Sequence, residues 1–205
     1  MPLTHFTDRH VVRLLATETR RADTTPHELT RSHRALGRFL AGELVELFPL
    51  ERRPIQHPQG IRDGWRVAGE PRITLCCMMR AGLYATEGVR EVLTHAPVVH
   101  VTPRRRSGLD ESDLEDLGSV QGRRVVLIDA VINTGASLEP ILGQLRERGA
   151  DLIAVLALVC PVATARRLEA EHPDVHFILA RISENQYVGK GTTDTGNRLF
   201  GTLPT

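Results

Sequence analysis

The sequence has few cysteines and no long hydrophobic run, and each shortage excludes a class of protein. Of 205 residues only three are cysteines, with Cys76 and Cys77 adjacent inside one apolar stretch and Cys160 at the end of another. This pattern predicts reduced core residues and not a disulfide framework. No stretch approaches about 18 uncharged apolar residues, and the N-terminus lacks the charged and apolar regions of a signal peptide. We therefore expect a cytoplasmic chain that does not associate with membranes.

The sequence also lacks a surplus of either charge. Lysine and arginine total 26 against 25 aspartates and glutamates, a net charge of +1, so bulk electrostatics offers no argument for a nucleic-acid partner. The nine histidines are scattered without the spacing of metal ligands, which favours solvated or capping positions for them. Any charged ligand must therefore be met by a local arrangement of side chains and backbone.

The hydrophobic pattern predicts a single α/β domain with a mostly parallel twisted sheet flanked by helices. We divide it into N-terminal helices and a connector (1–71), a parallel-sheet core (72–180) and a tail (181–205). Residues 8–48 follow a helical pattern and should pack on the flank of the sheet or on another subunit, and the connector contains one short strand near 65–67. The core predicts strands at 73–79, 98–102, 125–129, 152–159 and 175–179, with helices at 81–93, 138–148 and 162–171.

One stretch combines a buried strand with the features of a phosphate-binding loop. The apolar run from Arg124 ends in a single carboxylate, Asp129, and a short loop of small and hydroxyl-bearing residues follows, Asn133 to Ser137. Small side chains let backbone N–H groups close around an anion, and Ser137 is a candidate N-cap for a helix whose first turn contains Pro140. A helix that begins directly behind the loop directs its positive end at the same point.

The motif belongs to neither of the two commonest nucleotide-binding loops, because no G-x-G-x-x-G and no G-K-[ST] is present.

Three further segments follow strands at the edge where open parallel sheets bind ligands. They are Arg80-Ala81-Gly82, the basic run Arg104–Arg106 and the glycine-rich tail at 187–202. The acidic stretch at 107–121 has two readings that the sequence leaves open, a solvated loop with a helical turn or a mobile lid that excludes water from the site.

Together these segments resemble the uracil phosphoribosyltransferase family. The single-acid loop from Asp129 to Ser137 is similar to the ribose-phosphate loop of that branch, and Arg80-Ala81-Gly82 is similar to its I-L-R-A-G-L segment. The tail is similar to the closing segment Y-[IV]-x-P-G-x-G-D-A-G-D-R-x-F-G-T, and of the basic run only Arg105 matches. The matching segments occur in the family order along nearly the whole chain.

The resemblance implies transfer of phosphoribose from phosphoribosyl pyrophosphate to uracil or a uracil-like base. It implies a catalytic set of Arg80, Asp129 and Asp194, and Mg²⁺ that arrives with phosphoribosyl pyrophosphate and lies near Asp194. It also implies a homodimer or higher oligomer. The implied pyrophosphate site is Arg80, Ala81, Gly82 and Arg105; the implied ribose 5-phosphate site is Asp129, Asn133, Thr134, Gly135, Ala136 and Ser137; the implied base site is Tyr187, Val188, Gly189, Gly191 and Thr193.

The tail departs from the family pattern at positions that set its shape. Lys190 replaces a proline, Thr193 a glycine and Asn197 the second aspartate. The first change frees a backbone N–H and the second restricts a φ angle, so we expect uracil to be used less well than some other small heterocycle. Two alternatives remain open: a paralogue that acts on a different heterocycle in specialised nucleoside metabolism, or a non-catalytic regulator that binds phosphoribosyl pyrophosphate or a nucleotide.

Overall fold

A sheet of six parallel strands forms the centre of the computed structural model, which describes residues 3–104, 106–186 and 189–202. The strand order is β1-β8-β7-β6-β4-β5, and every neighbouring pair is parallel. The strands are β1 (Leu3–His5), β4 (Ile73–Met78), β5 (Val98–Val101), β6 (Arg124–Val131), β7 (Leu152–Pro161) and β8 (Val175–Ser183). The predicted fold class is confirmed, and every predicted core strand is present with ends shifted by up to four residues.

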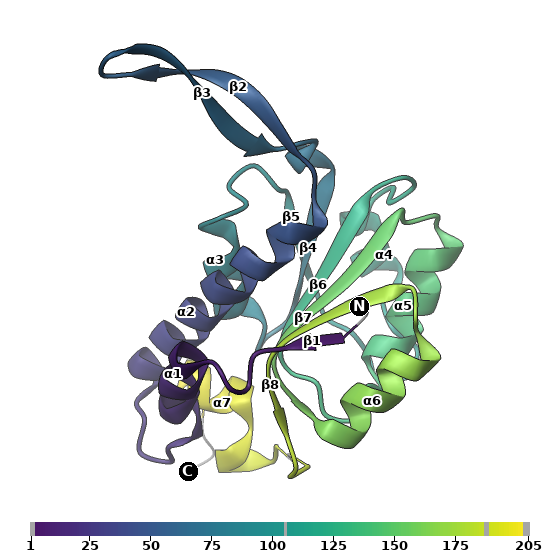
Figure 1. Cartoon of the computed structure of the whole chain (residues 1–205). Coiled ribbons are helices and arrows are strands. Elements are labelled where there is room, and N and C mark those ends of the chain that lie inside the picture. Colours follow the sequence, from purple (N-terminus) through teal and green to yellow (C-terminus); the bar gives the residue numbers. More distant parts are fainter. Residues whose placement is uncertain (1–2, 105, 187–188, 203–205) are drawn as a thin grey trace.

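Helices cover both faces of this sheet, which is why the central strands read as continuous apolar runs (Figure 1). One face carries α1 (His10–Arg20), α2 (Pro26–Leu44) and α3 (Leu83–Arg90), and the other carries α4 (Glu111–Leu117), α5 (Leu138–Glu147) and α6 (Val162–Glu171). The remaining helices are α7 (Thr195–Phe200) and three 3₁₀ turns, η1 (Val45–Leu47), η2 (Glu70–Arg72) and η3 (Gly191–Thr193).

The N-terminal helices pack against the sheet, which is one of the two arrangements predicted for them. Helix α2 begins with a capping box in which the Thr25 hydroxyl accepts from the Glu28 N–H, and Pro26 occupies its first turn. Helices α2 and α3 approach so closely that a Cβ on Gly88 would lie 2.0 Å from the Arg34 carbonyl oxygen.

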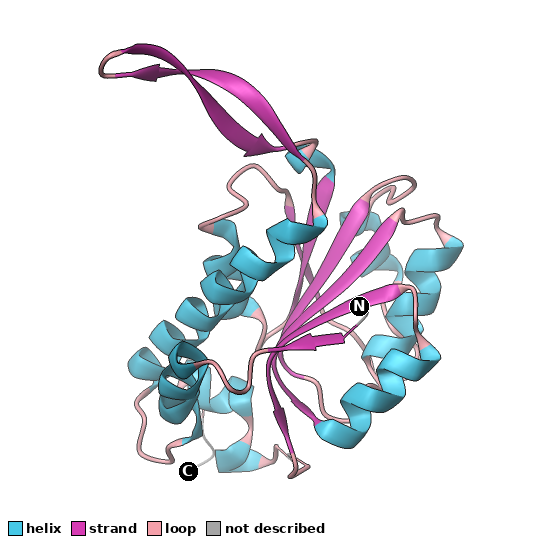
Figure 2. Cartoon of the chain, viewed as in Figure 1, coloured by secondary structure: helices cyan, strands magenta, loops and turns pink. Residues whose placement is uncertain are grey.

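Two strands were missed by the sequence pattern. Residues Leu3–His5 form β1, which pairs with β8 at the edge of the sheet, although three residues are too short to show a period. The connector contains a full antiparallel hairpin, β2 (Leu50–His57) and β3 (Gly60–Val67), where only a short strand near 65–67 was predicted. This arm projects away from the rest of the chain (Figure 2).

The acidic stretch at 107–121 is not a solvated loop, because part of it packs on the core. Its side chains Leu109, Leu117 and Val120 are buried in the cluster beneath α5. Helix α4 begins with a second capping box, and the Asp113 carboxylate also accepts from the Thr102 N–H at 2.9 Å. Nothing in this packing supports the lid reading, since the apolar residues of the stretch anchor it to the sheet.

The three cysteines are buried and free, as predicted. In the part of the chain that the structure describes, no helix is long and apolar enough to cross a membrane.

Candidate functional site

Asp129 lies near the carboxyl end of β6, two residues before the strand ends at Val131. The strand is thus longer than the sequence predicted. The half-buried Asp129 carboxylate accepts a hydrogen bond from the Ala130 N–H at 2.7 Å. Burial raises the pKa of Asp129 to about 6, against the smaller lowering effect of the Ala130 and Val131 N–H groups. A carboxylate in this state is ionised at neutral pH and able to accept from hydroxyl groups.

The loop that follows has its carbonyl groups occupied and several of its N–H groups free. Within the described residues, the N–H groups of Thr134, Gly135 and Ser137 have no hydrogen-bond partner. The carbonyls accept from the Thr164 hydroxyl (Asn133, 2.8 Å), the Arg167 guanidinium (Thr134, 2.7 Å), the Leu138 N–H (Gly135, 2.8 Å) and the Arg106 N–H (Ala136, 3.1 Å). This polarity suits an anion, because only donors remain available.

The details of the loop confirm one prediction and correct another. Helix α5 begins at Leu138, directly behind the loop, and Pro140 lies in its first turn. Ser137, however, does not cap the helix: its backbone is helical and its hydroxyl makes no capping hydrogen bond. The Gly135 carbonyl accepts the N–H groups of Leu138 and Glu139 instead, with Gly135 at a φ of +82°. The Ser137 hydroxyl therefore stays available to a ligand.

Arg80 reaches the C-terminal tail. It follows β4 after a cis Met79–Arg80 peptide bond. Its guanidinium donates to the Asn197 side-chain oxygen at 2.9 Å and lies 5.4 Å from the centre of the Phe200 ring. Two residues on, Gly82 packs so closely on β6 that a Cβ there would lie 2.3 Å from the Ile128 carbonyl oxygen. The segment Arg80-Ala81-Gly82 is thereby held beside the strand that carries Asp129.

Asp194 and Asn197 connect Arg80 to the tail. Asp194 is the N-cap of α7, and its carboxylate accepts from the Asn197 N–H at 2.8 Å. The Asn197 side chain both accepts from Arg80 and donates to the Gly191 carbonyl at 3.2 Å. The structure therefore brings together the predicted residues Arg80, Asp194 and Gly191, and it adds Asn197, which the sequence marked only as a departure from the family pattern.

The two substituted positions of the tail are paired in one turn. The N–H that Lys190 has and proline lacks donates to the Thr193 hydroxyl at 3.0 Å, and that hydroxyl in turn donates to the Lys190 carbonyl at 3.0 Å. The predicted free N–H is therefore not free. The Thr193 hydroxyl, which a glycine would lack, is the acceptor for the Lys190 N–H, which a proline would lack. The two replacements therefore compensate for each other.

The described arginines of the basic run at 104–106 contact nearby groups of the protein. Arg104 forms an ion pair with Asp110, Nη2 to Oδ2 2.9 Å, and Arg106 reaches the loop through its backbone N–H. Predicted positions Arg105, Tyr187 and Val188 lie outside the described residues, while Gly189 lies exposed just before the Lys190 turn.

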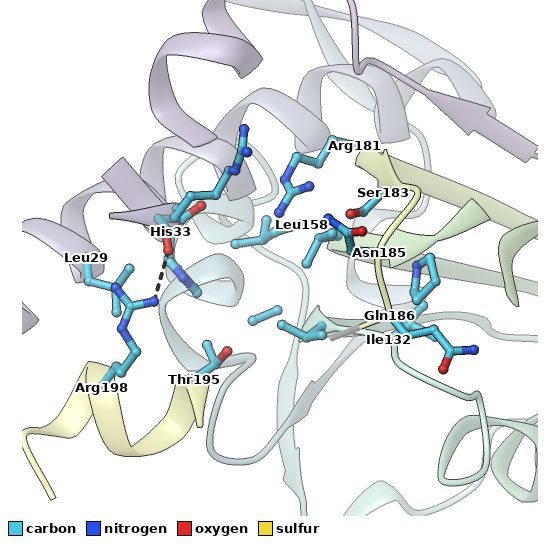
Figure 3. A pocket seen from close by; sticks show the side chains of 16 residues that line it. Leu29, His33, Ile132, Leu158, Arg181, Ser183, Asn185, Gln186, Thr195 and Arg198 are labelled. Atoms are coloured by element: carbon cyan, nitrogen blue, oxygen red, sulfur yellow. Dashed lines mark hydrogen bonds between the residues drawn. The ribbon is translucent and has the colours of Figure 1, made fainter. Parts of the chain in front are cut away.

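A cavity that the sequence did not reveal lies beside this constellation (Figure 3). It has a volume of about 270 Å³ and is bounded by the ends of β6, β7 and β8, by helices α1 and α2, and by the tail. Its lining includes His33, Ile132, Leu158, Arg181, Thr195 and Arg198. Arg198 donates to the Thr19 and Arg21 carbonyls and thereby joins α7 to the α1–α2 connection. Isolated arginines and histidines carry no sequence signal, so only the fold could reveal this cluster.

Comparison with known proteins assigns the chain to a family. The family model for uracil phosphoribosyltransferase matches residues 6–202. The chain belongs to the uracil phosphoribosyltransferase family. Uracil phosphoribosyltransferase of Staphylococcus carnosus is 27% identical over 97% of this chain and 98% of its own, and that of Enterococcus faecalis is 31% identical over 80% of this chain and 81% of its own.

Solved structures agree on the fold. The AQ2163 protein of Aquifex aeolicus matches with a TM-score of 0.81 at 21% identity over 98% of this chain and 99% of that chain. A hypoxanthine phosphoribosyltransferase of Staphylococcus aureus matches with a TM-score of 0.53 at 11% identity over 85% of each chain. Membership in the uracil phosphoribosyltransferase family makes this protein a pentosyltransferase that moves a phosphoribosyl group to a base, and the resemblance seen in its sequence is confirmed.

Proposed function

We propose that this phosphoribosyltransferase accepts uracil but uses another small heterocycle better. The observation that carries the phosphoribosyl part is the loop after Asp129, where N–H groups are free and carbonyls are occupied. The loop would hold the 5-phosphate, and the Asp129 carboxylate would accept from the ribose hydroxyls. Arg80 would face the pyrophosphate, with Arg105 as a second cation.

The reaction needs no covalent nucleophile from the protein. The bond from the anomeric carbon to pyrophosphate breaks while a ring nitrogen of the base approaches, so catalysis consists of orienting the base and stabilising the departing negative charge. Arg80 suits the second task because its guanidinium is held by an uncharged partner, Asn197, and no carboxylate lies within ion-pair distance of it among the described residues. Its charge is therefore available to the leaving group.

Mg²⁺ would come with the substrate. Among the described residues no three histidine, cysteine, aspartate or glutamate side chains cluster as metal ligands. Mg²⁺ commonly keeps several waters and binds through one or two carboxylates plus substrate phosphates, which fits a site with Asp129 and Asp194 as separate carboxylates. When bound, the ion would neutralise part of the pyrophosphate charge.

The preference among bases follows from the Lys190–Thr193 turn. The turn precedes Asp194 and adjoins the tail segment expected to read the base through backbone groups, so a changed hydrogen-bond pattern there moves those groups. The resembled family forms this turn with proline and glycine. A base with a pattern of hydrogen-bonding groups on its ring different from that of uracil should therefore bind best.

Two measurements test this proposal. Calorimetry with phosphoribosyl pyrophosphate should show binding, and nucleotide formation over a panel of bases should show transfer, with uracil active but exceeded by another ring. Binding without transfer to any base would support a regulator instead. A wild type that prefers uracil over every other base would reduce the tail substitutions to neutral changes.

We also propose a homodimer formed through the β2–β3 arm. A two-stranded ribbon is marginally stable alone, and this one exposes Ile61 at 70% and Trp65 at 60% of their surface. A second copy of the chain would cover these side chains.

A further inference from the structure

The cavity beside the predicted base segment has a chemistry that the family resemblance does not explain. It is continuous with the site, because its lining includes Ala130–Ile132, which follow Asp129, and Thr195, which follows Asp194. Its volume of about 270 Å³ corresponds to roughly nine water molecules at about 30 Å³ each. A single-ring base with a small substituent fits such a space. The inference below rests on the proposed function.

The charge of the cavity is positive. Arg20, Arg181 and Arg198 line it, and among the described residues no aspartate or glutamate does. The half-buried Arg181 side chain makes no ion pair or hydrogen bond within the described residues, and Figure 3 shows it pointing inward from the end of β8. Glu184, the nearest acid along the chain, is exposed, does not line the cavity and forms no ion pair with Arg181.

The three arginines are not equivalent. Arg198 already has acceptors, since it donates to the Thr19 and Arg21 carbonyls. Arg181 has none, and both burial and the like charge of Arg20 lower its pKa. A half-buried guanidinium without a counter-charge is unfavourable unless an anion pairs with it. Arg20 is exposed to solvent, so Arg181 is the half-buried cation whose charge a bound anion would balance.

His33 adds a second unsatisfied group. The residue is 3% exposed, and its Nδ1 is buried without a hydrogen-bond partner. Burial, with a smaller contribution from Arg198, lowers the pKa of His33 to about 4, so the ring is neutral at physiological pH and adds no charge. The neutral His33 imidazole and the unpaired Arg181 guanidinium line the same cavity, and they offer one polar contact for a ring and a charged fork for its substituent.

We propose that the preferred acceptor is a small heterocycle that carries a carboxylate, and that Arg181 binds this carboxylate. The acceptor is a better candidate for the anion than a separate effector, because the lining of the cavity includes both the residues that follow Asp129 and Asn185 and Gln186 at the start of the tail. A guanidinium fork pairs with the two oxygens of a carboxylate in a planar, bidentate geometry. Uracil lacks such a group and would leave Arg181 unpaired.

The test compares matched acceptors. Uracil, uracil-5-carboxylate and uracil-6-carboxylate are assayed for nucleotide formation with phosphoribosyl pyrophosphate, using the full chain. The variants are Arg181→Gln and Arg181→Lys, with Arg166→Gln as the control, an exposed arginine on α6 outside the cavity. Calorimetry of each carboxylated uracil, with and without phosphoribosyl pyrophosphate, and melting temperatures for every variant complete the set.

We expect kcat/KM to be higher for a carboxylated uracil than for uracil. Arg181→Gln should lower the ratio of kcat/KM for the carboxylated uracil to kcat/KM for uracil by about 10- to 100-fold, which is the effect of losing a charged hydrogen bond. Arg181→Lys should recover part of the ratio, and Arg166→Gln should leave it unchanged.

Equal ratios in wild type and Arg181→Gln, with uracil still converted, would overturn the inference while the proposed function stands. Arg181-dependent binding of a carboxylated uracil without transfer to any base would overturn the proposed function and keep the carboxylate site. Displacement of the carboxylated uracil by phosphoribosyl pyrophosphate would assign Arg181 to the phosphates and overturn the inference. If Arg181→Gln fails to fold, the same comparison of acceptors on the wild type decides, since a preference for uracil contradicts the inference.

Discussion

At the scale of single residues, Asp129 and Arg80 lie in opposite surroundings. Asp129 lies in a partly buried position where desolvation disfavours its charge. Arg80 is exposed, and its guanidinium contacts the Asn197 amide and the Phe200 ring. Asp129 is thus the group to test by varying the pH.

Asp129→Asn should weaken binding of phosphoribosyl pyrophosphate and remove part of its pH dependence. Because burial raises the pKa of Asp129 from about 4 to about 6, the wild-type carboxylate becomes protonated and loses acceptor capacity as pH falls through about 6. Calorimetry at several pH values between pH 5 and pH 8 measures this. The variant lacks the Asp129 carboxylate, so it serves as the control for pH dependence that arises from the substrate phosphates. Identical pH profiles for the two proteins would exclude Asp129 from the site.

The stability of the same variant should change in the opposite sense. A raised pKa means that the native state binds the proton more tightly than the unfolded chain, so ionised Asp129 costs stability above pH 6 and not below about pH 4. Asp129→Asn should therefore melt at the wild-type temperature or higher at pH 8. A variant that melts lower there would be losing packing and not only a ligand contact.

Arg80→Ala should lower kcat more than it weakens binding of phosphoribosyl pyrophosphate. The charge matters most as pyrophosphate departs, and a charged hydrogen bond is worth about 1.5–3 kcal/mol, so a loss of roughly tenfold to a hundredfold is expected. Steady-state kinetics measure this, with Arg90→Gln on the exposed surface of α3 as the control. A variant that loses only affinity, with kcat intact, would contradict the role.

At the scale of elements, the Lys190–Thr193 turn behaves as one unit. Lys190→Pro alone removes the donor to the Thr193 hydroxyl, and Thr193→Gly alone removes the acceptor, so each single change should lower transfer to every base. The double variant removes both and should improve uracil use relative to other bases. A double-mutant cycle on kcat/KM measures the coupling. Strictly additive losses would show that the two residues act separately.

At the scale of the whole molecule, the arm is the part of the chain that most needs a partner. Replacing Ile61 and Trp65 together by serine should convert a dimer into a monomer, because the change removes most of the exposed apolar surface of the arm. Sedimentation measures the state. Leu14→Ser is the matched control, since Leu14 is an exposed apolar side chain on α1, away from the arm. A monomeric wild type would contradict the proposal.

The family and most of the fold were predictable because their signals are local. Buried apolar runs such as 73–79 and 152–159 indicate strands of a parallel sheet, and pairs such as Thr25 and Pro26 indicate the start of a helix. The loop after Asp129 was visible because small residues between a strand and a helix have few other uses. The β1 strand and the arm were not predictable, since their pairing partners lie elsewhere or their pattern is weak.

The order of motifs along the chain alone determined the family, and it predicted a phosphate-binding loop and the Arg80 segment, because each motif is a run of neighbouring residues. Only the tertiary structure decided that Thr193 accepts the N–H of Lys190, that Asn197 holds Arg80, and that Arg181 lines a cavity without a counter-charge. These contacts depend on how a side chain is oriented after the strands and tail have met. Hydrophobic periodicity specifies which face of an element is buried, but it does not specify which polar groups then meet at the ends of the strands.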